Sequence, residues 1–483
     1  MTWLVLIKDW LPQLVIGLVV ATALASSVNV ILHKRDPRAA VSWLGFIVLL
    51  PLVGSVLYVT LGINRIQRRA RALRHRTPET HPSGPSHPCP REQLVRRIGQ
   101  KQLLRLADLI SKVAHNPLVD GNQAELLENG DAAFPVMLDA IERAQRCIAL
   151  SAYIFDNDAA GQRFVDALAR AVRRGVEVRV LIDAVGARYS FPPVTRSLRR
   201  QGVPCARFLP TVVPWRWPYM NLRNHRKILV VDGTVGFTGG MNIRHGNLLR
   251  ESPAYPIRDV HVQIRGPVVT QLQEAFNEDW AFTTGEVLDV DFWSPVVPPA
   301  GSIPARGIPD GPDADYDKLK LTLLGAVSSA KYSIRIVTPY FLPEATIVSA
   351  LNLAAMRGVR VDIVLPAQNN LALVQWASTD MLGDVLGRGC RVWLTPPPFD
   401  HAKLMVVDDG WTLLGSGNWD PRTLQLNFEF NVEFYDPTFA ARVARTIDAR
   451  IASAERLSEE ALARRSLPIK LRDGMARLVS PFL

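Results

Sequence analysis

Cysteine is scarce in this chain. Only four occur among 483 residues, and no two of them have the C-x-x-C spacing: they are Cys89, Cys147, Cys205 and Cys390. Zinc ribbons need closely paired cysteines, and disulfide-stapled domains carry many more of them for their length. Neither a structural zinc site nor a disulfide framework is therefore expected, and the four thiols are predicted to be reduced and buried.

The sequence also lacks a P-loop, G-x-x-x-x-G-K-[ST], and any acidic cluster with the spacing of divalent-cation ligands. The sequence thus contains no motif that would support nucleotide-dependent or metal-dependent chemistry. We therefore expect no metal and no cofactor. Acidic residues are the minority charge, with 45 Asp and Glu against 56 Lys and Arg and a formal net charge of +11. This balance favours an acidic partner, which could be anionic lipid, nucleic acid or the cytoplasmic flank of a membrane.

Two stretches near the N-terminus, residues 10–32 and 41–63, are uncharged and mainly apolar. Each has about the 20 residues that a helix needs to cross a hydrocarbon core of ~30 Å. Residues 1–64 are therefore predicted to form a two-helix transmembrane anchor. The alternative for the first stretch is a cleaved signal peptide, because Lys8 precedes it and residues 23–25 resemble a small-residue cleavage site. A second span so close behind favours the anchor.

Basic residues on the flanks of these stretches predict their orientation. The loop between them holds Lys34, Arg35 and Arg38, and a larger cluster follows the second stretch: Arg65, Arg68, Arg69, Arg71, Arg74 and Arg76. Basic flanks stay on the cytoplasmic side of a membrane. The larger cluster, with Lys8 on the same side, places both ends of the anchor and everything after residue 64 in the cytoplasm.

After a basic juxtamembrane segment and linker at residues 65–90, the remaining sequence repeats itself. A strand pattern at 148–150, a helical pattern at 164–172 and a buried strand at 174–182 return in the same order as 334–337, a stretch ending at Met356, and 357–365. Strand, helix, strand order predicts α/β/α sandwich halves with mixed, mostly parallel sheets. The expected boundaries are a first half at 91–285, a junction at 286–316 and a second half at 317–483 with a basic C-terminal tail.

Each half carries one H-x-K-x4-D motif: His225, Lys227 and Asp232 in the first, and His401, Lys403 and Asp408 in the second. We estimate that two such matches would occur by chance with a probability of about 10⁻⁴. Strand alternation is expected to put the His and Lys of each motif on one face. Hairpins at Asp232-Gly233 and Asp409-Gly410 then lead back to loops that present Asn242 and Asn418.

Two imidazoles, two ammonium groups and two carboxamides that converge suit a phosphodiester substrate. One His can attack phosphorus to give a phospho-histidine, and the other can protonate the leaving oxygen and later deprotonate the incoming hydroxyl. Asp232 and Asp408 lie at turns, where aspartate is common for structural reasons. We interpret them as structural supports with some catalytic relevance.

The duplicated motifs resemble those that define the phospholipase D superfamily, and the chain resembles its cardiolipin synthase branch over nearly its whole length. The segments that carry this resemblance beyond the motifs are 258–262 before Gly266-Pro267, 278–280, 338–343 and 426–429, together with the paired apolar stretches. The resemblance implies a single active site between the two halves. It also implies His225 as nucleophile and His401 as general acid and base.

The resemblance further implies that Lys227, Lys403, Asn242 and Asn418 hold the phosphate. Asp259 and Glu429 occupy matching places after the motifs, and each is expected to orient an imidazole and stabilise its charged form. Residues 396–400, before the second His, are more proline-rich and acidic than is typical of the branch, and they bear on the choice of acceptor.

Two peripheral segments leave alternatives open. Residues 466–479 are amphipathic and basic, which suits either an interfacial membrane helix or a helix docked on the catalytic body. Trp215, Trp217 and Tyr219 could rest at the lipid headgroup layer or belong to an ordinary aromatic loop.

The implied reaction is transfer of a phosphatidyl group from one phosphatidylglycerol to another through a phospho-histidine, giving cardiolipin and glycerol. The expected partners are anionic phosphatidylglycerol and the bilayer, without nucleic acid, and the expected location is the bacterial inner membrane as a multi-pass protein with a cytoplasmic catalytic part. The alternatives are a phospholipase D that hydrolyses the intermediate or transfers it to another alcohol, a nuclease, and a non-catalytic lipid-binding scaffold.

Overall fold

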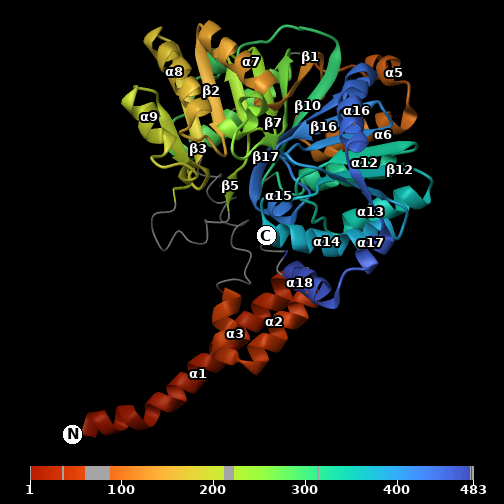
Figure 1. The fold of residues 1–483 in the computed structure, drawn as a ribbon. Helices are drawn as coiled ribbons and strands as arrows, with labels where there is room; N and C mark the ends of the chain where they lie inside the picture. Colours follow the sequence, from red (N-terminus) through yellow and green to blue (C-terminus); the bar gives the residue numbers. More distant parts are fainter. Residues whose placement is uncertain are drawn as a thin grey trace. The chain divides into compact units, whose positions relative to one another are not determined.

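A computed structural model describes residues 2–34, 37–59, 87–210, 222–312, 315–478 and 480 (Figure 1). The chain divides into two compact units, Met1–Arg69 and Ala70–Leu483. The aromatic residues Trp215, Trp217 and Tyr219 and the basic cluster at 65–76 lie outside the described residues. The predictions made for them stay predictions.

The N-terminal unit contains three helices: α1 (Thr2–His33), α2 (Pro37–Leu49) and α3 (Pro51–Leu57). Within α1, the 22 residues of Pro12–His33 form a helix long and apolar enough to cross a membrane. Tyr58 directly follows α3, and its hydroxyl donates a hydrogen bond of 2.9 Å to Asn29 Oδ1 in α1. This contact ties the far end of the unit back to the first helix.

The second predicted span is not a single helix. The helix breaks at Leu50, because Pro51 has no N–H to continue the hydrogen-bond ladder and starts a new helix instead. A Cβ atom on Gly54 would lie 2.4 Å from the Phe46 carbonyl oxygen, so α3 packs directly against α2. Helices of 13 and 7 residues rise about 20 Å and 10 Å, each short of a ~30 Å hydrocarbon core. A second transmembrane helix is therefore not confirmed.

The larger unit, Ala70–Leu483, is built on one 16-stranded sheet whose two halves mirror each other in strand order. The first half contributes β2 (Cys147–Ala152), β3 (Glu177–Asp183), β4 (Cys205–Phe208), β6 (Ile228–Val231), β7 (Val235–Gly239) and β9 (Val260–Arg265). The second contributes β11 (Ser333–Val337), β12 (Arg360–Pro366), β13 (Arg391–Thr395), β15 (Leu404–Val407), β16 (Trp411–Gly415), β17 (Asn427–Tyr435) and β18 (Glu455–Leu457). At the centre, β1 (Val119–Glu128) pairs with β10 (Ile303–Asp310) and joins the halves into one sheet.

The prediction of a mixed sheet is confirmed, but the prediction that it is mostly parallel is wrong. Parallel pairing is confined in the large sheet to β2–β3–β4, β11–β12–β13 and the short β5–β17 contact. The motif strands β6 and β15 run antiparallel to both of their neighbours. Crossover helices impose parallel pairing, whereas the strands after each motif return through three-residue turns that allow only antiparallel pairing.

Helices cover both faces of the sheet (Figure 1). One face is covered by α10 (Val269–Thr284) and α16 (Pro437–Ala452), whose buried residues share one core with strands of both halves. The opposite face carries α7 (Asn129–Arg143), α8 (Ala159–Arg173) and α9 (Val194–Arg200) on the first half. On the second half it carries α5 (Arg91–Ile98), α6 (Lys101–Val113), α12 (Lys318–Ser329), α13 (Ala345–Met356) and α14 (Ala372–Leu386).

Helices α5 and α6, which the sequence places at the start of the first half, contribute to the core of the second. Leu103 and Leu106 belong to the same buried cluster as Leu323 of α12. Gln102 Nε2 donates to Asp408 Oδ2 at 3.1 Å. Similarly, β10 lies inside the expected junction but is a buried strand of the central sheet. The duplicated halves are thus held together by segments that lie outside the repeat itself.

Candidate active site

The two H-x-K-x4-D motifs begin in short segments that cross from one half to the other. His225 and Lys227 lie between β5 (Arg223–Asn224) and β6, and β5 pairs with β17 of the second half. His401 and Lys403 lie between β14 (Phe399–Asp400) and β15, and β14 pairs with β8 (Ile257–Arg258) of the first half. The regular motif strands therefore start after each lysine, later than the sequence predicted.

Backbone hydrogen bonds fix both imidazoles against the opposite half. The His225 N–H donates to the Phe428 carbonyl at 2.9 Å, and the His401 N–H donates to the Arg258 carbonyl at 2.7 Å. These bonds bring the two motifs to the seam between the halves. A single shared site is the result.

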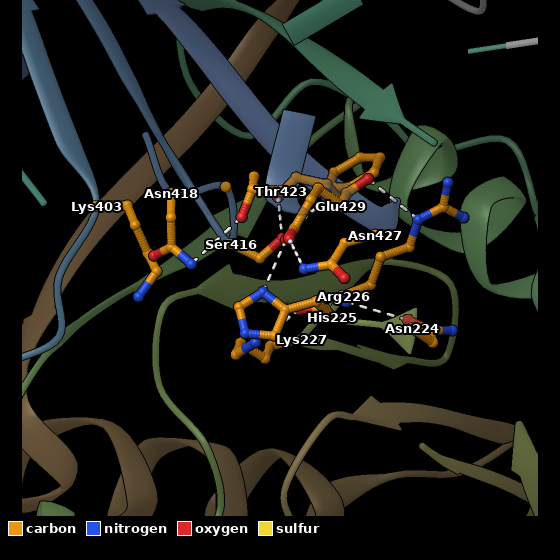
Figure 2. Close-up of polar contacts among 12 residues, drawn as sticks. Asn224, His225, Arg226, Lys227, Lys403, Ser416, Asn418, Thr423, Asn427 and Glu429 are labelled. Atoms are coloured by element: carbon orange, nitrogen blue, oxygen red, sulfur yellow. Dashed lines mark hydrogen bonds and ion pairs between the residues drawn. The ribbon is translucent and has the colours of Figure 1, made fainter. Parts of the chain in front are cut away.

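Each imidazole is paired with a carboxylate that belongs to the other half. His225 Nδ1 lies 2.9 Å from Glu429 Oε2, and His401 Nδ1 lies 2.8 Å from Asp259 Oδ2. Figure 2 shows the first of these pairs, with Glu429 between His225, Ser416 and Asn427. An ionised carboxylate can only accept, so Nδ1 carries a proton and Nε2 is the ring nitrogen left for a substrate.

The two carboxylates differ in their surroundings. Burial raises the pKa of Glu429 to about 7, against the opposing effect of Lys227 and of hydrogen bonds from Ser416 Oγ and Asn427 Nδ2. Burial also acts to raise the pKa of Asp259, but its hydrogen bond with His401 and the charges of His401 and Lys403 outweigh burial and leave that pKa lowered. Asp259 is thus the stronger counter-charge for a protonated imidazole.

The residues that face these two carboxylates also differ between the halves. A Cβ atom on Gly240 would lie 2.3 Å from Asp259 Oδ1. At the matching position of the second half stands Ser416, whose hydroxyl binds the longer Glu429 side chain. The repeat is therefore symmetric in plan and asymmetric in electrostatics.

The motif lysines are buried beside the imidazoles. Lys227 Nζ donates to the His225 carbonyl at 2.6 Å and lies 5.6 Å from the centre of the Tyr153 ring, and Lys403 Nζ donates to the His401 carbonyl. Burial lowers the pKa of Lys227 to about 7 and that of Lys403 to about 8. Burial and Lys403 likewise lower the pKa of His401 to about 4, and the pKa of His225 falls well below its usual range. All four groups would gain stabilisation in their protonated forms from an anion placed among them.

The asparagines expected to contact phosphate line the same cavity as the two imidazoles. Asn242 Oδ1 accepts a hydrogen bond from the Ile154 N–H at 3.1 Å, which leaves its amide nitrogen toward the cavity side. Asn418 Nδ2 donates to Thr423 Oγ1 at 3.3 Å. The loops after β7 and β16 therefore each place one carboxamide, that of Asn242 or Asn418, at the cavity wall.

This cavity has a volume of about 360 Å³ and is lined by both halves. Tyr153 and Tyr340 stand beside His225 and His401, with ring-centre separations of 4.9 Å and 6.3 Å. Arg422 lines the cavity too and forms no ion pair within the described part of the chain. Sequence reasoning missed Arg422 as a site residue, although it stands four residues after Asn418, in the short helix Pro421–Gln425.

Asp232 and Asp408 lie at the far ends of the motif strands, away from the imidazoles. The Asp232 carboxylate accepts hydrogen bonds from the N–H groups of Gln145, Arg146 and Cys147 at 2.8–3.2 Å. Asp408 does the same for the three residues that precede or begin β11: Lys331, Tyr332 and Ser333. These contacts anchor the hairpin turns to the neighbouring strands, so a contact with substrate does not fit either residue.

The hairpin turns differ slightly from the expectation. Asp232 and Gly233 both have positive φ, as an Asp-Gly turn requires. In the second half the positive φ values fall on Asp408 and Asp409, one residue earlier than the predicted Asp409-Gly410. Among the described residues, no group of three or more His, Cys, Asp and Glu side chains is arranged to hold a metal ion.

A search of protein-family models matches residues 137–280 and 323–451 to the cardiolipin synthase, phospholipase D-like domain. These two matches are the two halves that meet at the cavity. The chain belongs to the phospholipase D-like cardiolipin synthase family. Residues 21–62 match a second family model, described as the phospholipase D-nuclease N-terminal region.

Curated relatives agree with this assignment over nearly the whole chain. A cardiolipin synthase of Geobacillus kaustophilus is 32% identical and aligns with 94% of this chain and 90% of its own length. Cardiolipin synthase A of Pseudomonas fluorescens is 31% identical, over 95% of this chain and 96% of that protein. The major cardiolipin synthase of Bacillus subtilis is 29% identical, over 93% and 95%.

Among solved structures, phosphatidylserine synthase of Haemophilus influenzae superposes with a TM-score of 0.60. It is 16% identical and covers 78% of this chain and 100% of its own. At this identity the likeness concerns the fold alone. It shows that the fold of the larger unit also occurs in a protein of very different sequence.

Proposed function

We propose that this protein transfers a phosphatidyl group from one phosphatidylglycerol to the hydroxyl of a second, releasing glycerol and forming cardiolipin. The observation that carries this proposal is the pair of crossed imidazole–carboxylate contacts in one cationic cavity, at 2.9 Å and 2.8 Å. Two opposed imidazoles supply a nucleophile and an acid–base group for a two-step displacement at phosphorus.

In the first step, His225 Nε2 attacks the donor phosphorus and the bond from phosphorus to the glycerol oxygen breaks. His401 gives its Nε2 proton to that oxygen, so glycerol leaves and a phosphatidyl-histidine forms. The lowered pKa of Asp259 supports His401 as the acid, because an ionised Asp259 stabilises the imidazolium. An ionised Glu429 accepts from Nδ1–H of a neutral His225 and leaves the Nε2 lone pair free to attack.

In the second step, His401 accepts the proton of the acceptor hydroxyl, whose oxygen attacks phosphorus. The bond from phosphorus to His225 Nε2 breaks, and cardiolipin is released. Lys227, Lys403, Asn242 and Asn418 hold the non-bridging oxygens throughout, where their donors stabilise the charge that moves between entering and leaving oxygens. The low dielectric of the buried site strengthens these contacts.

The acceptor lipid brings a second phosphate, and Arg422 is suited to bind it. This arginine lines the cavity without an ion-pair partner among the described residues, and its helix α15 (Pro421–Gln425) is capped by Asp420, which accepts from the Thr423 N–H at 2.7 Å. Guanidinium groups bind phosphate in a bidentate manner. We therefore assign the acceptor phosphate to Arg422.

The test is reconstitution of the purified chain with phosphatidylglycerol as the sole lipid. Cardiolipin and glycerol should appear in equal amounts and both should vanish in His225→Ala. Phosphatidic acid without cardiolipin would instead establish a hydrolase. Turnover only after addition of another alcohol would establish a different transferase, and cleavage of single-stranded DNA would favour the nuclease.

The chain carries a membrane-spanning candidate in α1, and we propose that the catalytic unit faces the cytoplasm of a bacterial cell. We further propose that α2 and α3 form a hairpin that enters and leaves the bilayer on that same face. The hairpin would gather Lys34, Arg35, Arg38 and the 65–76 cluster on the cytoplasmic side, in accord with the positive-inside rule. The sequence had predicted two crossings instead.

Cysteine accessibility separates the two topologies. For the hairpin, the thiol of Arg35→Cys in intact cells is shielded from a membrane-impermeant maleimide and becomes labelled after the cells are opened. For two crossings, it is labelled from outside. Cys147 and Cys390 are buried, whereas Cys89 and Cys205 are partly exposed and are replaced by serine to limit background labelling.

A further inference from the structure

Helix α18 (Leu467–Leu478) docks on α14 of the catalytic unit, where Ala476 packs in a buried apolar cluster with Val374 and Ala377. Asp473 and Ala476 are its buried residues, and Asp473 pairs with Arg465 and Arg472. Arg477 reaches Asp380 of α14 at 3.2 Å. The prediction for this segment left two roles open, and these contacts realise the docking role.

The outward face of α18 is apolar, the reverse of an ordinary surface helix. Leu467, Leu471, Met475 and Leu478 are 68%, 59%, 69% and 76% exposed. Their spacing of four, four and three residues forms one continuous stripe along the helix. A contiguous exposed stripe of this kind marks a partner or a membrane surface.

Apolar packing links helix α18 to the wall of the catalytic cavity. Leu342 and Val374 line the cavity and belong to the same buried cluster as Ala476 of α18. On the outer side, Leu373 and Trp376 of α14 form a groove of about 520 Å³ with Leu471 and Met475. Packed apolar side chains therefore connect the groove with the wall of the catalytic cavity.

Basic side chains border the stripe. The Arg472 guanidinium lies 4.5 Å from the centre of the Trp376 ring, and Lys470 Nζ donates to the Ala463 carbonyl at 2.7 Å. Arg477 is exposed and lies seven residues after Lys470, on the same side of the helix. A basic rim around an exposed apolar face is the pattern of helices that lie in the interface of an anionic bilayer.

We propose that the α14–α18 surface docks on the anionic bilayer, with the stripe of α18 at the headgroup–acyl boundary. The lipid substrate then reaches the cavity laterally, its chains lying in the groove while its phosphate enters between the imidazoles. The substrate path rests on the proposed function. The docking itself does not.

The first test labels the full-length chain with an environment-sensitive fluorophore at Met475→Cys, with Cys89 and Cys205 replaced by serine, in phosphatidylglycerol vesicles. The matched control is Met356→Cys on α13, which is 56% exposed on the same half. Brominated acyl chains should quench the label at 475 and leave the label at 356 bright. Equal signals at the two positions, or quenching at 475 that depends on a second copy of the chain, would overturn the proposal.

The second test is kinetic. Leu467→Ser/Leu478→Ser, at stripe positions outside the groove, should raise the apparent KM for vesicular phosphatidylglycerol by about 10-fold, because two apolar side chains no longer enter the bilayer. Monomeric short-chain phosphatidylglycerol should be turned over as before, and Leu353→Ser/Met356→Ser should leave both activities unchanged. An equal loss on both substrates would refute a docking role. The absence of any turnover by the parent chain would refute the proposed function alone, since quenching still reports on docking.

Discussion

Substitution Asp259→Asn removes one charge from the acid–base pair and keeps its shape. Asp259 Oδ2 lies 2.8 Å from His401 Nδ1, and Oδ1 accepts from the Val260 N–H at 2.7 Å, a bond that an asparagine oxygen retains. With unit charges about 4 Å apart and an effective dielectric constant of about 20, the carboxylate stabilises the imidazolium by about 4 kcal/mol. We expect kcat to fall by about 10³-fold.

The assay is steady-state cardiolipin formation in vesicles, with thermal unfolding measured on the same samples. KM should change far less than kcat, because Asp259 acts on substrate through His401. The matched control is Asp362→Asn, another buried carboxylate, which binds Trp393 Nε1 at 2.7 Å and contacts no imidazole. A loss in Asp259→Asn no larger than in Asp362→Asn would refute the reasoning.

Three further outcomes follow from the site. Arg422→Gln should raise the acceptor KM by about 10-fold or more while leaving formation of the phosphatidyl-histidine intact, and equal loss of both half-reactions in single-turnover experiments would contradict an acceptor role. Because burial lowers the pKa of Lys227 to about 7, its ammonium is lost as pH rises through that value. Activity should therefore decline above about pH 7, and Lys227→Arg should shift this decline upward, as a pH–rate profile of kcat/KM would show. Asp232→Asn should lower the free energy of unfolding by about 2 kcal/mol, because its hydrogen bonds to the N–H groups of residues 145–147 are weakened. Turnover per folded molecule should change little. Denaturant titration and active-site counting measure the two quantities, and an unchanged stability or a loss of turnover per folded molecule would contradict the structural role.

Much of the architecture could be predicted because it depends on short-range sequence patterns. The strand, helix, strand patterns that start at Cys147 and Ser333 and the two motifs are short-range signals, and they fix the duplicated α/β units. The pairing direction of the sheet is a tertiary property, however. Strands β7 and β16 return antiparallel to the motif strands. Most strand pairs are therefore antiparallel, although the crossover pattern suggested parallel pairing.

The break in the second apolar stretch shows a different limit. Hydropathy treats residues 41–63 as uniform, whereas Pro51 interrupts the ladder and Gly54 permits α3 to approach α2 closely. Mean hydropathy over a window of residues does not reveal that the chain folds back within it. Length of the apolar stretch alone therefore does not establish a second crossing.

The site residues were named from the sequence, but their partners were not. Asp259 and Glu429 stand in matching places after their own motifs, and only the structure shows each one bound to the imidazole of the opposite half. Arg422 was missed because a single arginine carries no periodicity, and its value as an anion ligand depends on facing the cavity without an ion-pair partner among the described residues.

The most direct test of this account is to trap the covalent intermediate. The chain is mixed with phosphatidylglycerol, quenched within milliseconds without acid, and digested for mass spectrometry. The account predicts a phosphatidyl group on the imidazole of His225 and its absence in His225→Ala. A label on His401 would contradict the assigned roles, and rapid cardiolipin formation without any histidine adduct would contradict the two-step mechanism.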